Sequence, residues 1–306
     1  MAEKTPNQQL AEKLLFKPAY VGDKSAAVKQ EAHAFAEGYK KFLDAGKTER
    51  EVAAESEQML KNAGYQQFDP KKTYAPGDKV YFSQLGKAIV ASTIGTRSFE
   101  DGFRLVIAHT DSPRLDLRPT PLYESDHFSY FKTHYYGGIR KYQWATIPLA
   151  IHGVFSRADG TTVSVNVGED ENDPVFCITD LLPHLGAEQG ERKLSDGIRA
   201  EELNILIGSD AVDDEEVKEA VKLNTMILLN EKYGITEKDF ARAEIEIVPA
   251  YKSRDVGFDR SMIGGYGHDD RVDAYPALMA EIATKDPAFT TVCVLTDKEE
   301  IGSDGV

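Results

Sequence analysis

Three short segments of this chain carry side chains of the kinds that bind metal ions. They are residues 109–111, which include His109 and Asp111, residues 267–271 and residues 297–302. Each lies beside a segment whose composition predicts a buried strand or a helix, although the three are far apart in the sequence. Open α/β sheets collect their catalytic groups at the ends of neighbouring parallel strands, so a fold of this class would bring the segments together. The pattern predicts a two-zinc hydrolase.

The first segment follows an apolar run at residues 105–108, which predicts a fully buried strand that delivers His109 at its end. Asp111 comes two residues later, where its carboxylate could hold the ring nitrogen of His109 that does not bind metal. Metal-bound imidazole nearly always has such a partner. A structural histidine beside a solvated carboxylate is the alternative, and these residues alone leave both interpretations open.

The other two segments supply carboxylates. Glu299 and Glu300 are adjacent, and two carboxylates in one small cavity repel each other unless a cation lies between them. One would bind metal, and the other would act as the general base on a metal-activated water. Asp269 precedes a predicted helix, where the alternative is a helix cap; for the glutamates it is an exposed acidic loop. Carboxylates with few histidines suit paired Zn, Mn or Co better than a structural zinc.

The composition is that of a globular enzyme, with 41% hydrophobic and 28% charged residues in a chain of 306. The net charge of −15 argues against a nucleic-acid partner, because a phosphate backbone needs a basic surface. Cys177 and Cys293 are far apart, which predicts neither a disulfide framework nor a thiolate zinc site. The N-terminus is polar and no segment is apolar enough to span a bilayer, so we expect a cytoplasmic protein without a membrane partner.

The spacing of apolar residues predicts the secondary structure. Helices are expected over residues 25–43, 48–64, 215–233 and 272–282, and strands over 79–85, 87–94, 105–108, 161–167, 244–248 and 291–295. We expect Pro276 in the first turn of its helix and the acidic residues 213–216 at the N-terminus of theirs. Glycines and prolines break residues 117–249 into short pieces. This region is predicted to be a β-rich domain inserted between two parts of an α/β domain, residues 1–116 and 250–306.

Four segments resemble those of a known family. Residues 108–113, 269–271 and 299–303 are similar to segments of the aspartyl aminopeptidase family (M18) of cocatalytic zinc aminopeptidases, and residues 148–152 resemble a further family segment in the inserted domain. The resemblance implies a phosphorylase/hydrolase-like α/β fold, with a mixed sheet flanked by helices and an inserted β-rich dimerisation domain. It also implies a homo-oligomer, in which dimers assemble into a tetrahedral dodecamer.

The resemblance also implies roles for individual residues. His109 would bind one zinc, Asp269 would bridge both zinc ions and Glu300 would bind the other. Glu299 would be the general base, and Asp111 would hold the ring of His109.

The resemblance has further implications, for the contact between subunits, for one peptide bond and for the remaining zinc ligands. His152 would reach into the active site of a neighbouring subunit and help to hold the substrate, and the peptide bond between Asp269 and Asp270 would be cis. The family has one more aspartate and one more histidine as zinc ligands beyond the paired glutamates, and this sequence ends at Val306. We therefore expect the protein to continue past Val306, and the preference for an N-terminal residue is not read from this sequence.

The expected function is that of a cytoplasmic metalloaminopeptidase that removes the N-terminal residue of peptides with two Zn²⁺ ions, for which Mn²⁺ or Co²⁺ could substitute. One alternative is another cocatalytic zinc hydrolase of the carboxypeptidase or deacylase type, against which residues 148–152 argue. A second is an assembly protein that has lost its site. The presence of His109, Asp269, Glu299 and Glu300 argues against that.

Overall fold

The structure, a computed structural model, describes residues 4–18, 20, 22, 24–157, 159–303 and 305. The chain divides into two units, residues 1–39 and 40–306. The first unit holds α1 (Pro6–Leu14) and most of α2 (Ala26–Ala45). Thr5 caps α1, because its hydroxyl accepts a hydrogen bond from the Gln8 amide while the Gln8 side chain accepts one from the Thr5 amide.

The first and last of the predicted metal-binding segments lie at the ends of two strands of a five-stranded mixed sheet. Its strands, in the order β1-β2-β3-β14-β4, are β1 (Gln66–Gln67), β2 (Lys79–Gln84), β3 (Ala88–Thr93), β14 (Thr291–Thr296) and β4 (Arg104–His109). β14 is antiparallel to β3 and parallel to β4. Because β14 and β4 run in the same direction, their C-terminal ends lie at one edge of the sheet, with Thr296 opposite His109.

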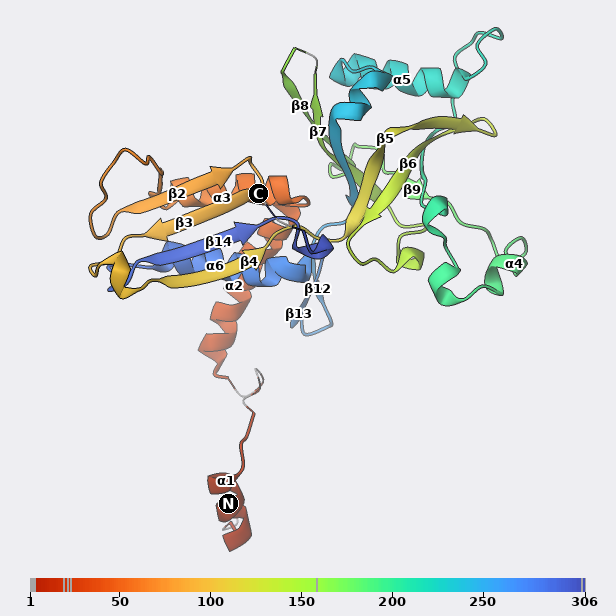
Figure 1. Cartoon of the computed structure of the whole chain (residues 1–306). Helices are drawn as coiled ribbons and strands as arrows, with labels where there is room; N and C mark the ends of the chain where they lie inside the picture. The colour runs from red at the N-terminus through yellow and green to blue at the C-terminus, as the bar shows by residue number, and fades with distance from the viewer. Residues whose placement is uncertain are drawn as a thin grey trace. The chain divides into compact units, whose positions relative to one another are not determined.

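Two helices, α3 (Glu49–Asn62) and α6 (His268–Ala283), cover one face of this sheet and lie behind it in Figure 1. Residues that point toward the helices, such as Cys293 and Leu295, are 2% and 1% exposed. The prediction that β4 is fully buried is wrong, since Leu105 and Ile107 are 47% and 58% exposed. Val106 is 50% exposed as well, and the reason is that β4 lies at the edge of the sheet and pairs only with β14 among the described strands.

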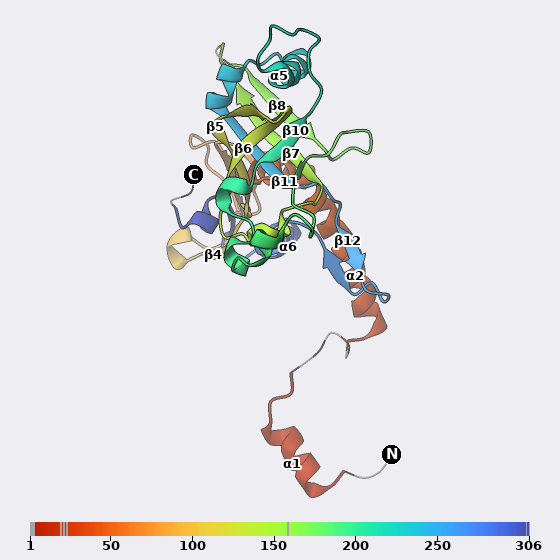
Figure 2. The same cartoon turned by 90° about the vertical axis from the view of Figure 1, so that its right-hand side faces the viewer.

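A second, seven-stranded sheet is built entirely from residues 114–249 (Figure 1, Figure 2). Its residues form an extensive apolar core. In the order β8-β7-β11-β5-β6-β10-β9, its strands are β8 (Thr162–Val167), β7 (Leu149–Ser156), β11 (Ala243–Pro249), β5 (Arg114–Ser125), β6 (Phe128–Tyr136), β10 (Ile205–Gly208) and β9 (Cys177–Ile178). All its pairings are antiparallel. The predicted domain boundary at residue 117 would fall within β5, and the boundaries themselves stay a prediction.

The remaining elements are short, except for one helix. They are α4 (Ala187–Gly190), α5 (Ala220–Tyr233), the hairpin of β12 (Arg254–Val256) and β13 (Met262–Gly264), and the 3-10 helices η2 (Phe99–Asp101), η3 (Lys141–Gln143), η4 (Leu194–Asp196), η5 (Ala200–Glu202), η6 (Glu237–Arg242) and η7 (Glu299–Ile301). No described helix combines the length and apolar character needed to cross a membrane. Both cysteines are free thiols.

Two local predictions are wrong, one about where α5 begins and one about the position of Pro276 in α6. Helix α5 begins at Ala220 and not within the acidic residues 213–216, because its first free amides, on Val221 and Lys222, donate to the carboxylate of Glu124 on β5 at 3.0 and 2.9 Å. The cap therefore comes from a distant strand. Pro276 lies in the interior of α6, not in its first turn.

The Glu124 cap gives a stability prediction. Glu124→Ala should lower the free energy of unfolding by about 0.5–2 kcal/mol, the usual cost of losing a helix N-cap. Glu124→Gln should cost less, because its side-chain carbonyl can still accept one amide. Glu215→Ala, in the acidic cluster, is the matched control and should have no effect in urea denaturation. A larger loss for Glu215→Ala than for Glu124→Ala would show that the helix is capped by the acidic cluster.

Candidate metal centre

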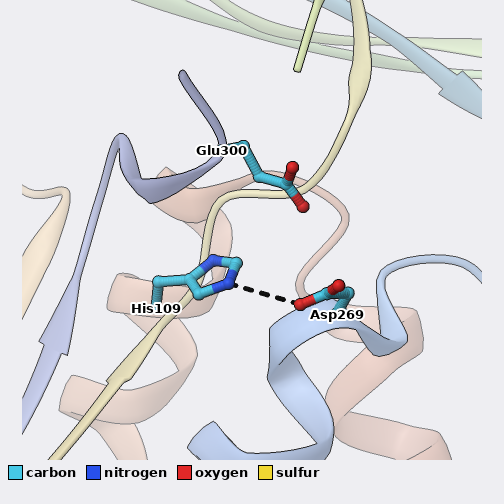
Figure 3. A group of neighbouring side chains, drawn as sticks. All are labelled: His109, Asp269 and Glu300. Carbon is cyan, nitrogen blue, oxygen red and sulfur yellow. Dashed lines mark ion pairs between the residues drawn. The ribbon is translucent and has the colours of Figure 1, made fainter. Parts of the chain in front are cut away.

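Three elements of the second unit bring His109, Asp269 and Glu300 to one point (Figure 3). His109 is the last residue of β4, Asp269 lies at the start of α6, and Glu300 lies in η7 directly after β14. Each residue offers a ligand atom, and these atoms all lie within 4.8 Å of one another. The Nε2 atom of His109 is 3.4 Å from Oδ1 of Asp269. The structure thus brings together the three predicted metal ligands.

Asp111 is completely buried behind this group and contacts two of its segments. Its Oδ1 atom lies 3.2 Å from Nδ1 of His109, which is also 3.0 Å from the Asp111 carbonyl oxygen. The carboxylate further accepts hydrogen bonds from the backbone amides of Glu299 and Glu300, at 3.3 and 3.2 Å. It therefore fixes the orientation of the imidazole and the path of the turn that carries both glutamates.

The segment around Asp269 has a distinctive backbone. The peptide bond between Asp269 and Asp270 is cis, as the family resemblance predicts. The carbonyl oxygen of Asp269 accepts a hydrogen bond from Ser112 Oγ at 2.8 Å, and the carboxylate of Asp270 accepts one from the His109 amide at 3.3 Å. These two bonds tie the start of α6 to the end of β4. Ser112 lies within the family-like segment 108–113, but the sequence predicts a role only for Asp269 and not for Ser112.

The charges in the group favour a bound cation. Burial, followed by the neighbouring carboxylate of Asp269, raises the pKa of Glu300 above its usual value. Burial alone would lower the pKa of His109, but the Asp111 carboxylate and carbonyl outweigh it and the net shift is upward. A cation would relieve this crowding of negative charge. One imidazole and two carboxylates are donors that zinc accepts, so the residues present fit that metal.

Glu299 lies beside the group but points more toward solvent. Its side chain is 64% exposed, and its Oε2 atom is 3.5 Å from Nε2 of His109. The carboxylate is therefore next to the candidate metal ligands without belonging to their tightest grouping.

His152 lies apart from this group in the described chain. Its ring is 1% exposed, with Nδ1 2.8 Å from Glu51 Oε1 and Nε2 3.3 Å from Glu169 Oε1. Burial lowers its pKa, but the two carboxylates raise it more, so the net shift is upward. Glu169, hydrogen-bonded to His152 and Lys252, has a pKa lowered to about 2 although burial opposes this. The role of His152 across a subunit boundary stays a prediction.

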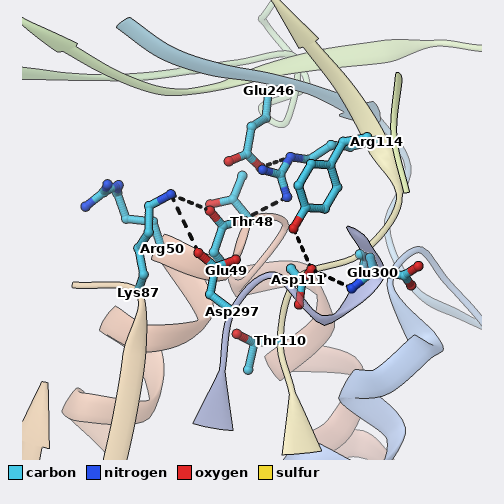
Figure 4. A network of polar contacts seen from close by, with 12 residues as sticks. Thr48, Glu49, Arg50, Lys87, Thr110, Asp111, Arg114, Glu246, Asp297 and Glu300 are labelled. Carbon is cyan, nitrogen blue, oxygen red and sulfur yellow. Dashed lines mark hydrogen bonds and ion pairs between the residues drawn. The ribbon is translucent and has the colours of Figure 1, made fainter. Parts of the chain in front are cut away.

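A second group of acidic residues lies between the two sheets (Figure 4). Glu49, Glu244 and Glu246 bring carboxylate oxygens within 4.8 Å of one another. The amine of Lys87 already contacts two of them, Glu49 at 3.0 Å and Glu244 at a shorter distance. Arg114 contacts Glu49 and Glu246 at 3.2 and 3.1 Å. Arg50 also pairs with Glu244 at 2.6 Å, so three cations face the three carboxylates, and we interpret the group as an ion-pair network.

A cavity of 310 Å³ opens next to Asp269. The aromatic rings of Trp144 and Tyr266 line it, together with residues of the loop that follows β6. Arg140 is the single lysine or arginine among its described lining residues. No hydrogen bond or ion pair engages the Arg140 guanidinium within the described residues, so this positive charge is available to an anionic group.

The family description "Aminopeptidase I zinc metalloprotease (M18)" matches residues 42–306. The chain belongs to this family. A probable M18 family aminopeptidase 1 from Clostridium acetobutylicum is 50% identical over 280 residues, which cover 90% of this chain and 60% of the relative. Its counterpart from Thermotoga maritima is 47% identical over 281 residues, with the same coverage. This chain thus spans about 60% of the length of these M18 relatives.

Solved structures of M18 proteins agree with the fold. The aminopeptidase from Thermotoga maritima matches with a TM-score of 0.86 at 46% identity, over 90% of this chain and 60% of that one. Aminopeptidase I from Clostridium acetobutylicum gives a TM-score of 0.87 at 43% identity, over 95% and 65%. The yeast mApe1 dodecamer, at 18% identity and a TM-score of 0.66, covers 89% of this chain and 62% of its own and shows likeness of fold alone. The predicted fold class is confirmed.

The contacts of His152 give a prediction with a defined pH dependence. Because the folded-state pKa of His152 lies above its usual value of 6.5, its ion pairs stabilise the fold fully below that value and lose their effect as the pH rises through the folded-state pKa. His152→Asn should therefore lower the free energy of unfolding by about 1–3 kcal/mol near pH 6 and by less near pH 9. His184→Asn, at an exposed position, is the control and should show no such dependence. A loss for His152→Asn that is equal at both pH values in denaturant titrations would contradict the ion-pair assignment.

Proposed function

We propose that this protein is a metalloaminopeptidase that hydrolyses the N-terminal residue of peptides. The observation that carries the proposal is the convergence of His109, Asp269 and Glu300 in a chain of the M18 family. The same membership weighs against the carboxypeptidase or deacylase alternative. All four proposed site residues are present, namely His109, Asp269, Glu299 and Glu300. Their presence weighs against an assembly protein without activity.

In this proposal His109, Asp269 and Glu300 would hold two zinc ions, for which Mn²⁺ or Co²⁺ could substitute. Such ions would polarise a scissile carbonyl group and lower the pKa of water toward neutrality. A catalytic zinc normally has three protein ligands, more than these residues provide when shared between two ions.

Glu299 is the proposed general base. Its carboxylate lies beside His109 and is mostly exposed, so it can reach a water molecule next to the metal ligands without being one of them. It would take a proton from that water and later give it to the amine of the departing peptide. Asp111 would meanwhile hold the imidazole of His109 in the orientation that binds metal.

The division of roles between the two glutamates can be measured directly. Glu299→Gln should retain bound zinc but lose roughly two orders of magnitude or more in turnover of an aminoacyl substrate, because it removes the base and leaves the ligands. Glu300→Gln should lose zinc. Metal content by mass spectrometry and turnover would be measured on both variants. Loss of zinc from Glu299→Gln but not from Glu300→Gln would reverse the two roles.

We also propose a preference for acidic N-terminal residues. Support comes from the cavity next to Asp269, where the Arg140 guanidinium could pair with a carboxylate of the peptide.

Replacing that charge should change selectivity more than catalysis. Arg140→Gln should lower kcat/KM for an N-terminal aspartyl substrate by roughly tenfold and leave a leucyl substrate nearly unchanged, since only the first loses a charged partner. Arg118→Gln, at another cavity, is the control. Equal losses on both substrates would mean that Arg140 contacts the common backbone of the peptide, and no loss would remove it from the binding site.

The assembly is a proposal as well. We propose a homo-oligomer built from dimers that form through the seven-stranded sheet, arranged as a tetrahedral dodecamer in which His152 contributes to a neighbouring active site. Support comes from M18 membership and from the dodecamer described for yeast mApe1. The burial of His152 against Glu51 and Glu169 would then require a rearrangement or a role in support of the shared site. A monomer with full activity in analytical ultracentrifugation would overturn this proposal.

A further inference from the structure

Asp111 receives one hydrogen bond from outside the metal-binding segments. The hydroxyl of Tyr136, the last residue of β6, donates to Asp111 Oδ2 at 2.7 Å. This is the shortest of the hydrogen bonds to the Asp111 carboxylate, and it is the one that comes from the seven-stranded sheet. Tyr136 is only 9% exposed, so water does not readily replace its hydroxyl.

The ring of Tyr136 is itself held in place by Arg114. The two residues are cross-strand partners on β6 and β5, and the guanidinium lies 3.8 Å from the centroid of the ring. A cation over an aromatic face is attracted to it, more strongly when both are buried. Arg114 is fixed in turn by Glu49 of α3 and Glu246 of β11, at 3.2 and 3.1 Å. The phenol thus has a defined position before any substrate or metal binds.

The loop after Tyr136 also approaches the candidate metal ligands. Gly137 has a φ of +69°, and a Cβ atom at this position would lie 3.3 Å from the side chain of Glu300. Tyr136 therefore contacts the carboxylate that holds the Glu299–Glu300 turn, and the backbone at Gly137 leaves room for a hydrogen but not for a larger side chain beside Glu300. The seven-stranded sheet reaches the metal centre of its own chain at this point.

We infer that Tyr136 is a positioning residue, through which the seven-stranded sheet orients Asp111 and thereby the His109 ring and the Glu299–Glu300 turn. The inference rests on the proposed function for the identity of the site, and it deepens that proposal. Tyr136 touches neither substrate nor metal in this arrangement. It acts by fixing the rotamer of a carboxylate that three other groups use.

The hydroxyl group, and not the ring, carries this role. A buried carboxylate that loses one donor is less well satisfied, and its side chain becomes free to rotate away from Nδ1 of His109. Burial and the hydrogen bond to Asp111 raise the pKa of Tyr136, so the phenol remains a donor throughout the neutral range. Tyr136→Phe therefore removes one hydrogen bond and keeps the ring that packs against Arg114.

The test measures metal affinity directly, with Co²⁺ as the probe. Groups that bond directly to a metal ligand typically contribute 10- to 100-fold to metal affinity. Tyr136 bonds to Asp111, which in turn contacts the ligand His109, so Tyr136→Phe should weaken Co²⁺ binding by about tenfold, at the low end of this range. The Co²⁺ absorption spectrum should shift, because the His109 ring is less well fixed. Tyr135→Phe, on the same strand and 39% exposed, is the matched control and should change neither quantity.

A double-mutant cycle separates positioning from a general structural effect. In the Asp111→Asn background, adding Tyr136→Phe should change Co²⁺ affinity by less than about twofold, since the group through which Tyr136 acts is already altered. An equal loss in both backgrounds would overturn the inference, as would wild-type affinity in Tyr136→Phe alone. These affinities are measured without substrate. If the wild-type protein binds Co²⁺ but cleaves no peptide, the proposed reaction is contradicted. The Co²⁺ affinities of the variants would still test the role of Tyr136.

Discussion

The candidate metal centre depends on one buried carboxylate. Asp111 is inaccessible to water, so its charge must be balanced by groups of the protein, and the structure supplies four of them. Two are the amides of Glu299 and Glu300, one is the His109 ring and one is the Tyr136 hydroxyl. These groups come from three segments of the sequence, residues 109, 136 and 299–300, so satisfying a single charge places the His109 ring beside the turn that carries both glutamates.

The two sheets are joined by charges as well as by the chain. Lys87 contacts Glu49 of α3 and Glu244 of β11, and Arg114 contacts Glu49 and Glu246 (Figure 4). Buried ion pairs pay a large desolvation cost, so such a network adds little net stability. The network instead specifies how the two sheets are placed relative to each other, because displacement of either sheet would leave buried charges without partners. A fixed relation between the sheets is what lets β6 reach Asp111.

The sequence predicted the features that depend on local pattern. The runs that became β4 and β14 were visible as apolar strands, and the ligand-rich segments at their ends were visible as clusters. The features it could not predict depend on partners far away in the chain. Glu124 caps a helix almost a hundred positions later, and Tyr136 lies in a stretch of strand that has no motif of its own. The exposure of β4 was missed because an apolar run indicates a strand but not which neighbours cover it.

The order of strands in the five-stranded sheet has a consequence for how the protein folds. β3 and β4 follow one another in the chain but are separated in the sheet by β14. Just past the end of β4, Thr110 hydrogen-bonds to Thr296 of β14, and these two residues are 186 positions apart. Closing so long a loop is slow. The N-terminal strands are made first on the ribosome, and they cannot complete their sheet until β14 has been made. Until residues 291–296 emerge, β3 and β4 each present an open edge that can pair with strands of other chains. The candidate metal centre at the ends of β4 and β14 should therefore form late, and the newly made chain is most prone to aggregate just before it does.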